Sequence, residues 1–264
     1  MVRAVQTLRD IAALRAFVGA QRSTARRVAL VPTMGALHAG HIALLRAARA
    51  RAEAVVASVF VNPLQFNEVR DFEHYPRDLE GDAARLRDTG CDALWAPSDA
   101  TMYPEGHSVT VRAGRAAQGF EGTHRPGHFD GVVTVVAKLF NQVQPDSVVF
   151  GEKDWQQLAV VREMVQDLNF PIEICGAPIE RDQAGLALSS RNALLSEEGL
   201  AVARRLNAVL RAGGGAEDLL SVGFEKVDYV GLLAGRVVAA VWVEGVRLID
   251  NVENAGHPLP AGSR

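Results

Sequence analysis

Cysteine and lysine are both scarce in this chain of 264 residues. The two cysteines, Cys91 and Cys175, form no C-x-x-C pair, so the sequence indicates neither a disulfide framework nor a thiolate zinc site. A reducing compartment is the simplest interpretation, and we expect a cytoplasmic protein. Only three of the 28 basic residues are lysine, namely Lys138, Lys153 and Lys226, so each lysine that remains is mildly informative.

Long apolar runs and an excess of positive charge are also absent. No stretch approaches about 18 apolar residues, the length at which a membrane-spanning helix is considered. Near the N-terminus, Arg9, Asp10 and Arg15 interrupt the apolar run that a secretory signal needs. Lys plus Arg total 28 against 31 for Asp plus Glu, which gives a net charge of -3. We therefore expect neither a membrane nor nucleic acid as a partner.

Composition and periodicity are those of a folded α/β protein. Hydrophobic residues make up 48% of the chain and charged residues 22%, and the length allows one large domain or two modest ones. Short apolar runs alternate with segments rich in helix formers, a pattern that predicts a doubly wound, parallel, Rossmann-like sheet. The expected strands cover 28–32, 54–61, 92–96, 147–150 and 172–175, and the expected helices cover 41–52, 78–89, 130–143 and 155–168.

Two helical segments rest on more specific signals. The spacing of Ile11, Leu14 and Val18 predicts a first helix, with Thr7 followed by Asp10 as its start signal. In VVTVVAKLF at 132–140 the valines favour a strand by propensity, whereas length and alternation favour a helix.

The pattern changes after residue 177. A loop is followed by a predicted helix from Ser196 through Arg211 that glycines at 213–215 end, and then by three β-like segments at 227–233, 236–243 and 246–250. This order indicates a small α+β domain. We expect a nucleotide- and substrate-binding domain over 1–177 and a smaller lid domain over 178–264.

The turn after the strand at 28–32 carries the first candidate site. It contains neither G-x-x-x-x-G-K-[ST] nor G-x-G-x-x-G, which weighs against a P-loop kinase and a nicotinamide dehydrogenase. PTMGALHAGH places His38 and His41 where a turn enters a helix, a position at which they can donate to an anion. The alternative is one capping histidine and one partly buried one. A half zinc site is less favoured, because no second ligand pair has suitable spacing.

Two further segments end predicted strands with polar side chains. SVFVNPLQFN at 58–67 offers the amides of Asn62 and Gln65 for a small polar substrate, or is an ordinary polar loop. FGEKDWQQL at 150–158 supplies a glycine for close backbone approach, Lys153 for phosphate and Asp154 for a ribose hydroxyl or a metal-bound water.

In this order and spacing, the segments resemble the pantothenate synthetase family of H-x-G-H nucleotidyltransferases. The quoted matches are PTMGALHAGH, FVNPLQF, YPR at 75–77, HRPGHFDGVVTVV at 124–136, FGEKD, GLALSSRN at 185–192 and RLIDN at 247–251. The chain departs from the family at Ala184, where an acidic residue is usual, and in a stretch between Tyr229 and Val237 that is shorter than usual.

The resemblance implies an ATP-dependent ligase. The family condenses pantoate with β-alanine through a pantoyl adenylate and releases pyrophosphate and AMP. It implies ATP as a substrate, Mg²⁺ held largely by the nucleotide and water, no metal site built by the protein, and a homodimer. Two other hypotheses remain: a nucleotidyltransferase acting on a phosphorylated acceptor, and a catalytically inactive nucleotide-binding regulator.

The resemblance also assigns site residues position by position. His41 is the expected proton donor, and Gln65 and Gln157 are expected to bind pantoate, with Asn62 beside them. Apart from the resemblance, His124, Arg125 and His128 lie in the glycine-rich segment GTHRPGHFDG, where they either have a structural role or line the site. The catalytic set is His38, His41, Lys153, Ser189, Ser190 and Arg191, and the ATP-binding set is Met34, Gly35, Ala36, Leu37, His38, Ala39, Gly40, His41, Gly151, Glu152, Lys153, Asp154, Glu180, Leu188, Ser189, Ser190 and Arg191.

Overall fold

Six strands form one sheet in the computed structural model, which describes residues 5–67, 72–87, 89–254 and 256. Their order across the sheet is β1-β4-β3-β2-β5-β6, and β2 runs parallel to both β3 and β5. The strand order reverses between β2 and β5, the kind of switch point at which open α/β sheets bind ligands. The strands are β1 (Gln6–Leu8), β2 (Val28–Thr33), β3 (Ala54–Val59), β4 (Ala93–Trp95), β5 (Ser147–Gly151) and β6 (Glu173–Ala177).

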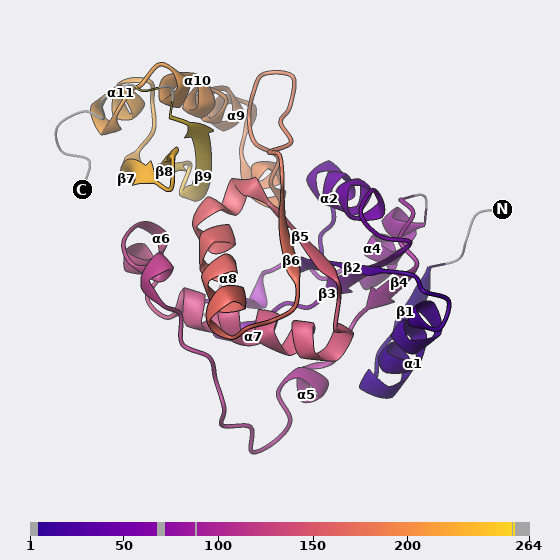
Figure 1. Ribbon diagram of the computed structural model, residues 1–264. Coiled ribbons are helices and arrows are strands. Elements are labelled where there is room, and N and C mark those ends of the chain that lie inside the picture. Colours follow the sequence, from indigo (N-terminus) through magenta and orange to yellow (C-terminus); the bar gives the residue numbers. More distant parts are fainter. Residues whose placement is uncertain (1–4, 68–71, 88, 255, 257–264) are drawn as a thin grey trace. The chain divides into compact units, whose positions relative to one another are not determined.

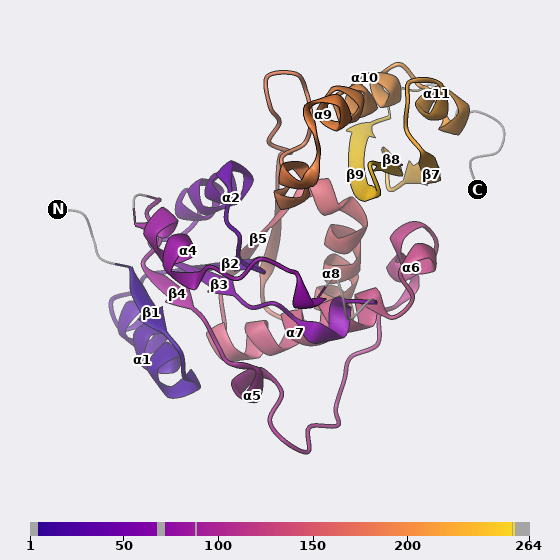
Figure 2. The same cartoon turned by 180° about the vertical axis from the view of Figure 1, so that it is seen from behind.

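Helices cover both faces of this sheet (Figures 1 and 2). α2 (Ala39–Arg49) and α4 (Leu79–Leu86) pack on one face, and α1 (Ile11–Arg22) and α7 (His128–Val143) pack against each other on the opposite face. The predicted doubly wound, Rossmann-like sheet is confirmed. Further helical segments are α5 (Asp99–Met102), α6 (Phe120–His124), α8 (Trp155–Asp167) and the 3-10 turns η1 (Pro63–Gln65), η2 (Arg115–Ala117) and η3 (Glu152–Asp154).

The start of the first helix differs from the prediction. Asp10, whose carboxylate accepts the N–H of Ala13 at 2.8 Å, is the N-cap of α1. Thr7 lies instead in β1, which pairs in parallel with β4, so Thr7 stands opposite Leu94. The three-residue strand is set by this distant pairing and has no local signal of its own.

The valine-rich segment at 132–140 is helical, as its length and the alternation of elements predicted. α7 is buried along most of its length, with Val132, Val133 and Val136 each less than 5% exposed. The free energy gained by burying these side chains outweighs the modest helix propensity of valine.

A three-stranded antiparallel sheet forms the second unit together with short helices. β7 (Lys226–Leu233) and β8 (Arg236–Val243) are joined by a two-residue turn at Ala234 and Gly235, both with positive φ, within the 229–237 stretch that the sequence resemblance indicated to be short. The predicted helix over 196–211 is two helices, with Ser196 as N-cap, and α11 was not predicted. The other elements are β9 (Val246–Glu253), η4 (Ser190–Leu194), α9 (Glu197–Ala203), α10 (Arg205–Arg211) and α11 (Ala216–Ser221).

The chain divides into one unit of Met1–Phe150 and Val160–Ala177 and a second of Gly151–Ala159 and Pro178–Arg264. The sequence interpretation placed 151–159 in the first domain, but this segment groups with the second unit. The physical reason is that side chains attach this segment to the second unit. Trp155 Nε1 donates to the Leu233 carbonyl at 2.9 Å, and the guanidinium carbon of Arg236 lies 4.6 Å from the centroid of the Trp155 ring. Within the described ranges, no helix is long and apolar enough to span a bilayer.

Candidate functional site

His38 and His41 lie at the turn that enters α2. His38 is the N-cap, and its Nδ1 accepts the N–H of Gly40 at 3.1 Å. The Nδ1 of His41 accepts the N–H of His38 at 3.2 Å, and the two ring centroids are 4.2 Å apart. Because an accepting Nδ1 carries no proton, each neutral imidazole carries its proton on Nε2. Helix capping and donation to an anion, which the sequence presented as alternatives, are therefore compatible in one geometry.

A carboxylate from another helix holds the loop before His38. Asp82 of α4 is 1% exposed and accepts the N–H of Ala36 at 3.0 Å and that of Leu37 at 2.8 Å. Gly35 has a φ of +86°, and a Cβ there would lie 2.9 Å from the same carboxylate. The turn thus requires glycine for its backbone and for space. Sequence reasoning missed Asp82, because it lies 45 positions beyond Leu37 and carries no motif.

Asn62 and Gln65 belong to a hydrogen-bond network at the end of β3, where Asn62 is 1% and Gln65 8% exposed. Asn62 Nδ2 donates to Gln65 Oε1 at 3.1 Å, and Asn62 Oδ1 accepts from the Tyr103 hydroxyl at 2.7 Å. The Gln65 amide nitrogen lies 2.8 Å from the sulfur of Met34. Burial raises the pKa of the Tyr103 hydroxyl, which therefore stays protonated and continues to donate. The network orients the Gln65 amide so that its NH₂ group faces Met34.

Arg125 and His128 hold the backbone of Gln65 in place. His128 is 7% exposed, its Nδ1 donates to the Gln65 carbonyl at 2.8 Å, and Arg125 Nη2 donates to the same oxygen at 3.2 Å. Arg125 Nη1 lies 3.2 Å from His128 Nε2, which accepts in this tautomer. His124 is exposed. Of the three candidates in HRPGHFDG, two are thus placed next to Gln65 through its main chain.

α7 approaches η1 very closely at Gly131. The Gly131 carbonyl accepts from Asn62 Nδ2 at 3.0 Å, and a Cβ at this position would lie 2.3 Å from the Leu64 carbonyl oxygen. Such a separation is impossible without movement of the backbone, so glycine allows the helix to support the turn that carries Gln65.

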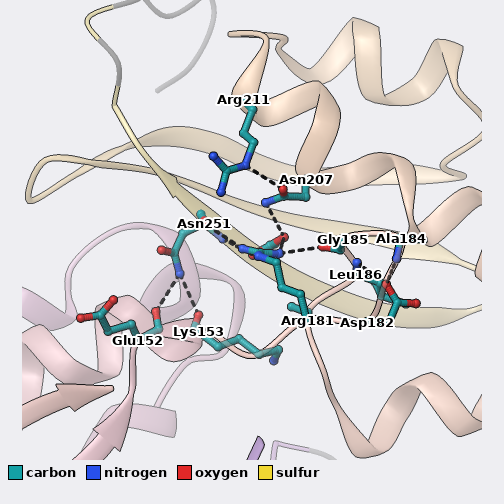
Figure 3. Close-up of polar contacts among 12 residues, drawn as sticks. Glu152, Lys153, Arg181, Asp182, Ala184, Gly185, Leu186, Asn207, Arg211 and Asn251 are labelled. Atoms are coloured by element: carbon teal, nitrogen blue, oxygen red, sulfur yellow. Dashed lines mark hydrogen bonds and ion pairs between the residues drawn. The ribbon is translucent and has the colours of Figure 1, made fainter. Parts of the chain in front are cut away.

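In the second unit, Lys153 stands on η3, a turn anchored at several points. Asn251 of β9 donates from Nδ2 to the Glu152 carbonyl at 2.8 Å and to the Lys153 carbonyl at 3.0 Å. Arg236 donates to Asn251 Oδ1 at 2.7 Å and pairs with the Glu152 carboxylate at 3.0 Å. Lys153 is half-buried and Asp154 is exposed. Figure 3 shows the Lys153 carbonyl turned toward Asn251 and its side chain running away from it.

A short hairpin carries the two other segments assigned to ATP in this unit. Leu188 N–H donates to the Glu180 carbonyl at 2.9 Å, and Arg181 bridges to Ala187. Arg181 forms a bidentate ion pair with Asp250, at 2.7 and 2.8 Å, and donates to the Gly185 carbonyl at 3.0 Å (Figure 3).

The residues after Leu188 continue into η4. Ser189 is its N-cap and accepts the Arg191 N–H at 3.3 Å, while Ser190 is the first residue of the turn. The Arg191 side chain is exposed.

Ala184, where the sequence resemblance led us to expect an acidic residue, lies at the tip of this hairpin. It is exposed, and its N–H donates to Asp182 Oδ1 at 2.9 Å, as does the N–H of Leu186 at 2.8 Å. Burial alone raises the pKa of Asp182, but hydrogen bonds from Arg204, Leu186 and Ala184 outweigh it and lower that pKa. Because the Ala184 contact is made by the backbone, the tip of the hairpin does not depend on an acidic side chain at this position.

Among the residues that the structure describes, no group of three or more His, Cys, Asp or Glu side chains could hold a metal ion. Glu152 is engaged by Arg236, whereas the Asp154 carboxylate on the same turn is exposed. An exposed carboxylate oxygen can ligate Mg²⁺ or accept a hydrogen bond from Mg²⁺-bound water. With one such carboxylate, the turn could contribute to a Mg²⁺ site only together with the phosphates of a nucleotide.

Comparison with known proteins decides the family. The family model for pantoate-beta-alanine ligase matches residues 6–253. This chain is a member of the pantoate-beta-alanine ligase family. Pantothenate synthetase from Sphingopyxis alaskensis is 48% identical, over 94% of this chain and 99% of the relative, and that from Mesorhizobium japonicum is 47% identical, over 94% and 97%.

Solved structures of this ligase family agree. Pantothenate synthetase from Thermus thermophilus is 43% identical and superposes with a TM-score of 0.83 over 94% of this chain and 99% of its own. The pantoate-beta-alanine ligase from Francisella tularensis, solved with beta-gamma ATP and beta-alanine, is 35% identical and gives a TM-score of 0.85 over 95% and 98%. The protein is thus an enzyme of pantothenate biosynthesis, as the sequence resemblance implied.

The assigned residues of this ligase fall into a group in each unit. Met34, Asn62 and Gln65 meet in the first unit, and the histidine pair lies on the turn and helix that follow β2. The second unit contains the other assigned residues, namely Gly151, the η3 residues, half-buried Gln157, exposed Glu180 and the 188–191 segment. The side chains that fix them, such as Asp82, Tyr103 and Asn251, carried no recognised role in the sequence. Only the RLIDN match marked Asn251 at all.

Proposed function

We propose that this chain condenses pantoate with β-alanine in two steps, with ATP as the activating substrate. A pantoate carboxylate oxygen attacks the α-phosphorus of ATP, and the bond from that phosphorus to the β-phosphate bridging oxygen breaks, releasing pyrophosphate. The β-alanine amine then attacks the acyl carbon of the pantoyl adenylate. The acyl carbon–oxygen bond breaks, AMP leaves, and the amine loses a proton to give the amide.

The observation that carries the proposal is the histidine pair at the start of α2. With both Nδ1 atoms accepting backbone N–H groups, both Nε2–H groups act as donors at a helix N-terminus, where partial positive charge also favours phosphate. We assign His38 and His41 to the ATP phosphates, and His41 to proton donation as charge develops on the phosphoryl oxygens. Preorganised donors of this kind typically contribute about 2.7 to 4 kcal/mol each to transition-state stabilisation.

The other roles follow the position-by-position resemblance. The backbone from Met34 to His41 and the Gly151–Asp154 turn bind the nucleotide, Lys153 contacts its phosphates, and the Glu180 backbone meets the adenine. Leu188 to Arg191 bind the triphosphate. The Asp154 carboxylate is the candidate to face Mg²⁺, which when bound would neutralise charge on the phosphates.

Pantoate is assigned to the amide network. Gln65 and Gln157 bind it, with Asn62 orienting the Gln65 amide, and Gln65 also serves β-alanine. An amide pair recognises hydroxyl and carboxylate oxygens without adding charge, which suits a small hydroxy acid better than a phosphorylated acceptor. This difference separates the proposal from another H-x-G-H nucleotidyltransferase.

The test is ATP–pyrophosphate exchange with and without pantoate. Exchange that requires pantoate, in wild type but not in Gln65→Ala, is expected, with nucleotide affinity nearly unchanged in the variant. Exchange driven by another acid would favour a different nucleotidyltransferase, and nucleotide binding without exchange under any acid would favour an inactive regulator.

We also propose a homodimer that works in the cytoplasm. Family resemblance supports the dimer, and two buried, unpaired cysteines are consistent with a reducing compartment. Sedimentation equilibrium at micromolar concentration is expected to give twice the mass of the chain, and a monomer mass would contradict the dimer.

A further inference from the structure

Asn251 is buried, 1% exposed, and its side-chain NH₂ group binds the turn that carries Lys153. Its NH₂ group donates to the carbonyls of Glu152 and Lys153, and its Oδ1 accepts from Arg236. A buried amide so engaged fixes the backbone it touches, because moving either carbonyl would leave a buried donor unpaired.

The backbone of Asn251 is itself immobilised by the neighbouring ion pair. Asn251 N–H donates to Asp250 Oδ1 at 2.7 Å, and Arg181 Nη2 donates to the Asn251 carbonyl at 3.3 Å. Asp250 is 3% exposed and Arg181 pairs with it in a bidentate manner, so the anchor rests on a rigid base. Asp250 and Asn251 are consecutive residues of β9, and Figure 3 shows the Asn251 side chain reaching Glu152 and Lys153 close to Arg181.

We propose that Asn251 is a positioning residue that places the Lys153 ammonium by fixing the main chain from which it projects. The inference rests on the proposed function in that Lys153 is taken to contact ATP phosphates. Among the described residues, no ion pair holds the Lys153 ammonium, so its location depends on its Cα and on its own rotamers. Because the four-carbon side chain is flexible, the ammonium occupies a reproducible position only when the Cα atom is fixed.

Removing the anchor should therefore reduce activity without touching a reacting atom. A displacement of about 1 Å in a reacting group can cost about 10²-fold in rate, so Asn251→Ala is expected to lower kcat of pantoate-dependent exchange by about 10- to 100-fold. Asn251→Asp keeps the acceptor toward Arg236 but places a carboxylate against two carbonyl oxygens, and it should be at least as slow as Asn251→Ala.

A matched control is Asn207→Ala. Asn207 is also a buried asparagine of the second unit, 8% exposed, that accepts from Arg211. It reaches Asp250 only through a long hydrogen bond of 3.4 Å, so the Arg181–Asp250 pair would keep Asp250 in place, and within the described ranges no hydrogen bond joins Asn207 to η3. Both variants should lower the melting temperature by similar amounts, whereas exchange by Asn207→Ala should remain near that of wild type.

The decisive measurement is a double-mutant cycle with Lys153→Ala. If Asn251 acts through Lys153, Asn251→Ala should slow exchange by the Lys153→Ala enzyme by no more than about twofold. A change of that size is within the usual deviation from additivity, because the Lys153 contribution is already absent in this background. The proposal is overturned if Asn251→Ala retains wild-type exchange, or if it slows the Lys153→Ala enzyme as much as it slows wild type.

The same four proteins can be compared by their affinity for an ATP analogue, a measurement that tests the positioning role of Asn251 without relying on the proposed reaction. A non-hydrolysable ATP analogue should bind more weakly to Asn251→Ala and to Lys153→Ala, with no further loss in the double variant. Wild-type protein that shows no pantoate-dependent exchange would refute the proposed function, yet non-additive losses of analogue affinity would still support the positioning role. Additive losses would refute it.

Discussion

Lys153 carries an ammonium in a chain that uses arginine at most basic positions. It stands on a turn whose carbonyls are held by Asn251 and whose neighbouring glutamate pairs with Arg236, so its backbone is fixed, whereas no ion pair within the described part of the chain holds its ammonium. An ammonium is a compact point charge that can follow phosphoryl oxygens as charge moves between them. A guanidinium is planar, with its donors fixed in a fork.

We expect Lys153→Arg to fold normally and to lose activity. Its exchange rate should fall on the order of 10²-fold, comparable to the loss of one preorganised donor, with an unchanged melting temperature. Lys226→Arg is the matched control, because Lys226 is exposed and pairs with Asp228 at 2.8 Å, a contact that arginine can keep. Wild-type exchange in Lys153→Arg would reduce Lys153 to a generic positive charge.

Asp82 offers a second test at this scale. In Asp82→Asn the amide can accept one of the N–H groups of Ala36 and Leu37, but its NH₂ group then faces the other. We expect a loss of about 1 to 3 kcal/mol in the free energy of unfolding, measured by urea denaturation, and weaker nucleotide affinity. Asp78→Asn is the control, since Asp78 is the exposed N-cap of α4 and asparagine caps equally well. Equal stability of the two variants would mean that the carboxylate does not hold the loop.

The elements differ in how far their sequences predict them. Strands such as β2 and helices such as α7 were predicted because periodicity, length and alternation all act within a short window. β1 was missed because three residues carry too little pattern and its partner, β4, lies far along the chain. The site shows the same division. The residues within motifs could be predicted from resemblance, whereas Asp82 and Tyr103 act across long sequence separations and had no local signal. Asn251 lies in the RLIDN match, but nothing local indicated its contacts with the distant Glu152 and Lys153 carbonyls.

The contact between α7 and η1 gives a prediction about elements. Gly131→Ala must push η1 away from the helix, because its Cβ would meet the Leu64 backbone. We expect a large rise in the KM for pantoate in exchange, with analogue affinity for ATP nearly unchanged. Gly19→Ala is the control: Gly19 also lies in a helix, has nothing within 4 Å of its Cβ position, and should stabilise the protein by roughly 0.5 to 1 kcal/mol. Normal pantoate dependence in Gly131→Ala would show that η1 can shift without consequence.

At the scale of the whole molecule, the reactivity of the two cysteines measures how often the apolar core of the first unit becomes accessible to solvent. Burial raises the pKa of Cys91 to about 11 and also raises that of Cys175. Both thiols are buried within one apolar cluster with α2 and β3. A thiol with a raised pKa reacts more slowly, because only the thiolate is nucleophilic.

We therefore expect neither thiol to react with a disulfide reagent within minutes in native protein at pH 8, and both to react at once in denaturant. The reaction of native Cys91 should accelerate only as the pH approaches about 11. Rapid native labelling of either cysteine at pH 8 would mean that this cluster opens far more often than its packing suggests.

The assignment of 151–159 to the second unit has a consequence for how the gene can be divided. The chain passes between the two units three times, at 150/151, 159/160 and 177/178, so neither unit is encoded by one uninterrupted stretch. A fragment consisting of 178–264 alone would leave Asn251 and Arg236 without Glu152 and Lys153, and the Leu233 carbonyl without the Trp155 donor. Such a fragment should need the peptide 151–159 supplied in trans, or fused through a new linker, before it folds. A fusion or swap that treats residue 177 as a clean boundary would therefore exchange the second unit without one of its own segments.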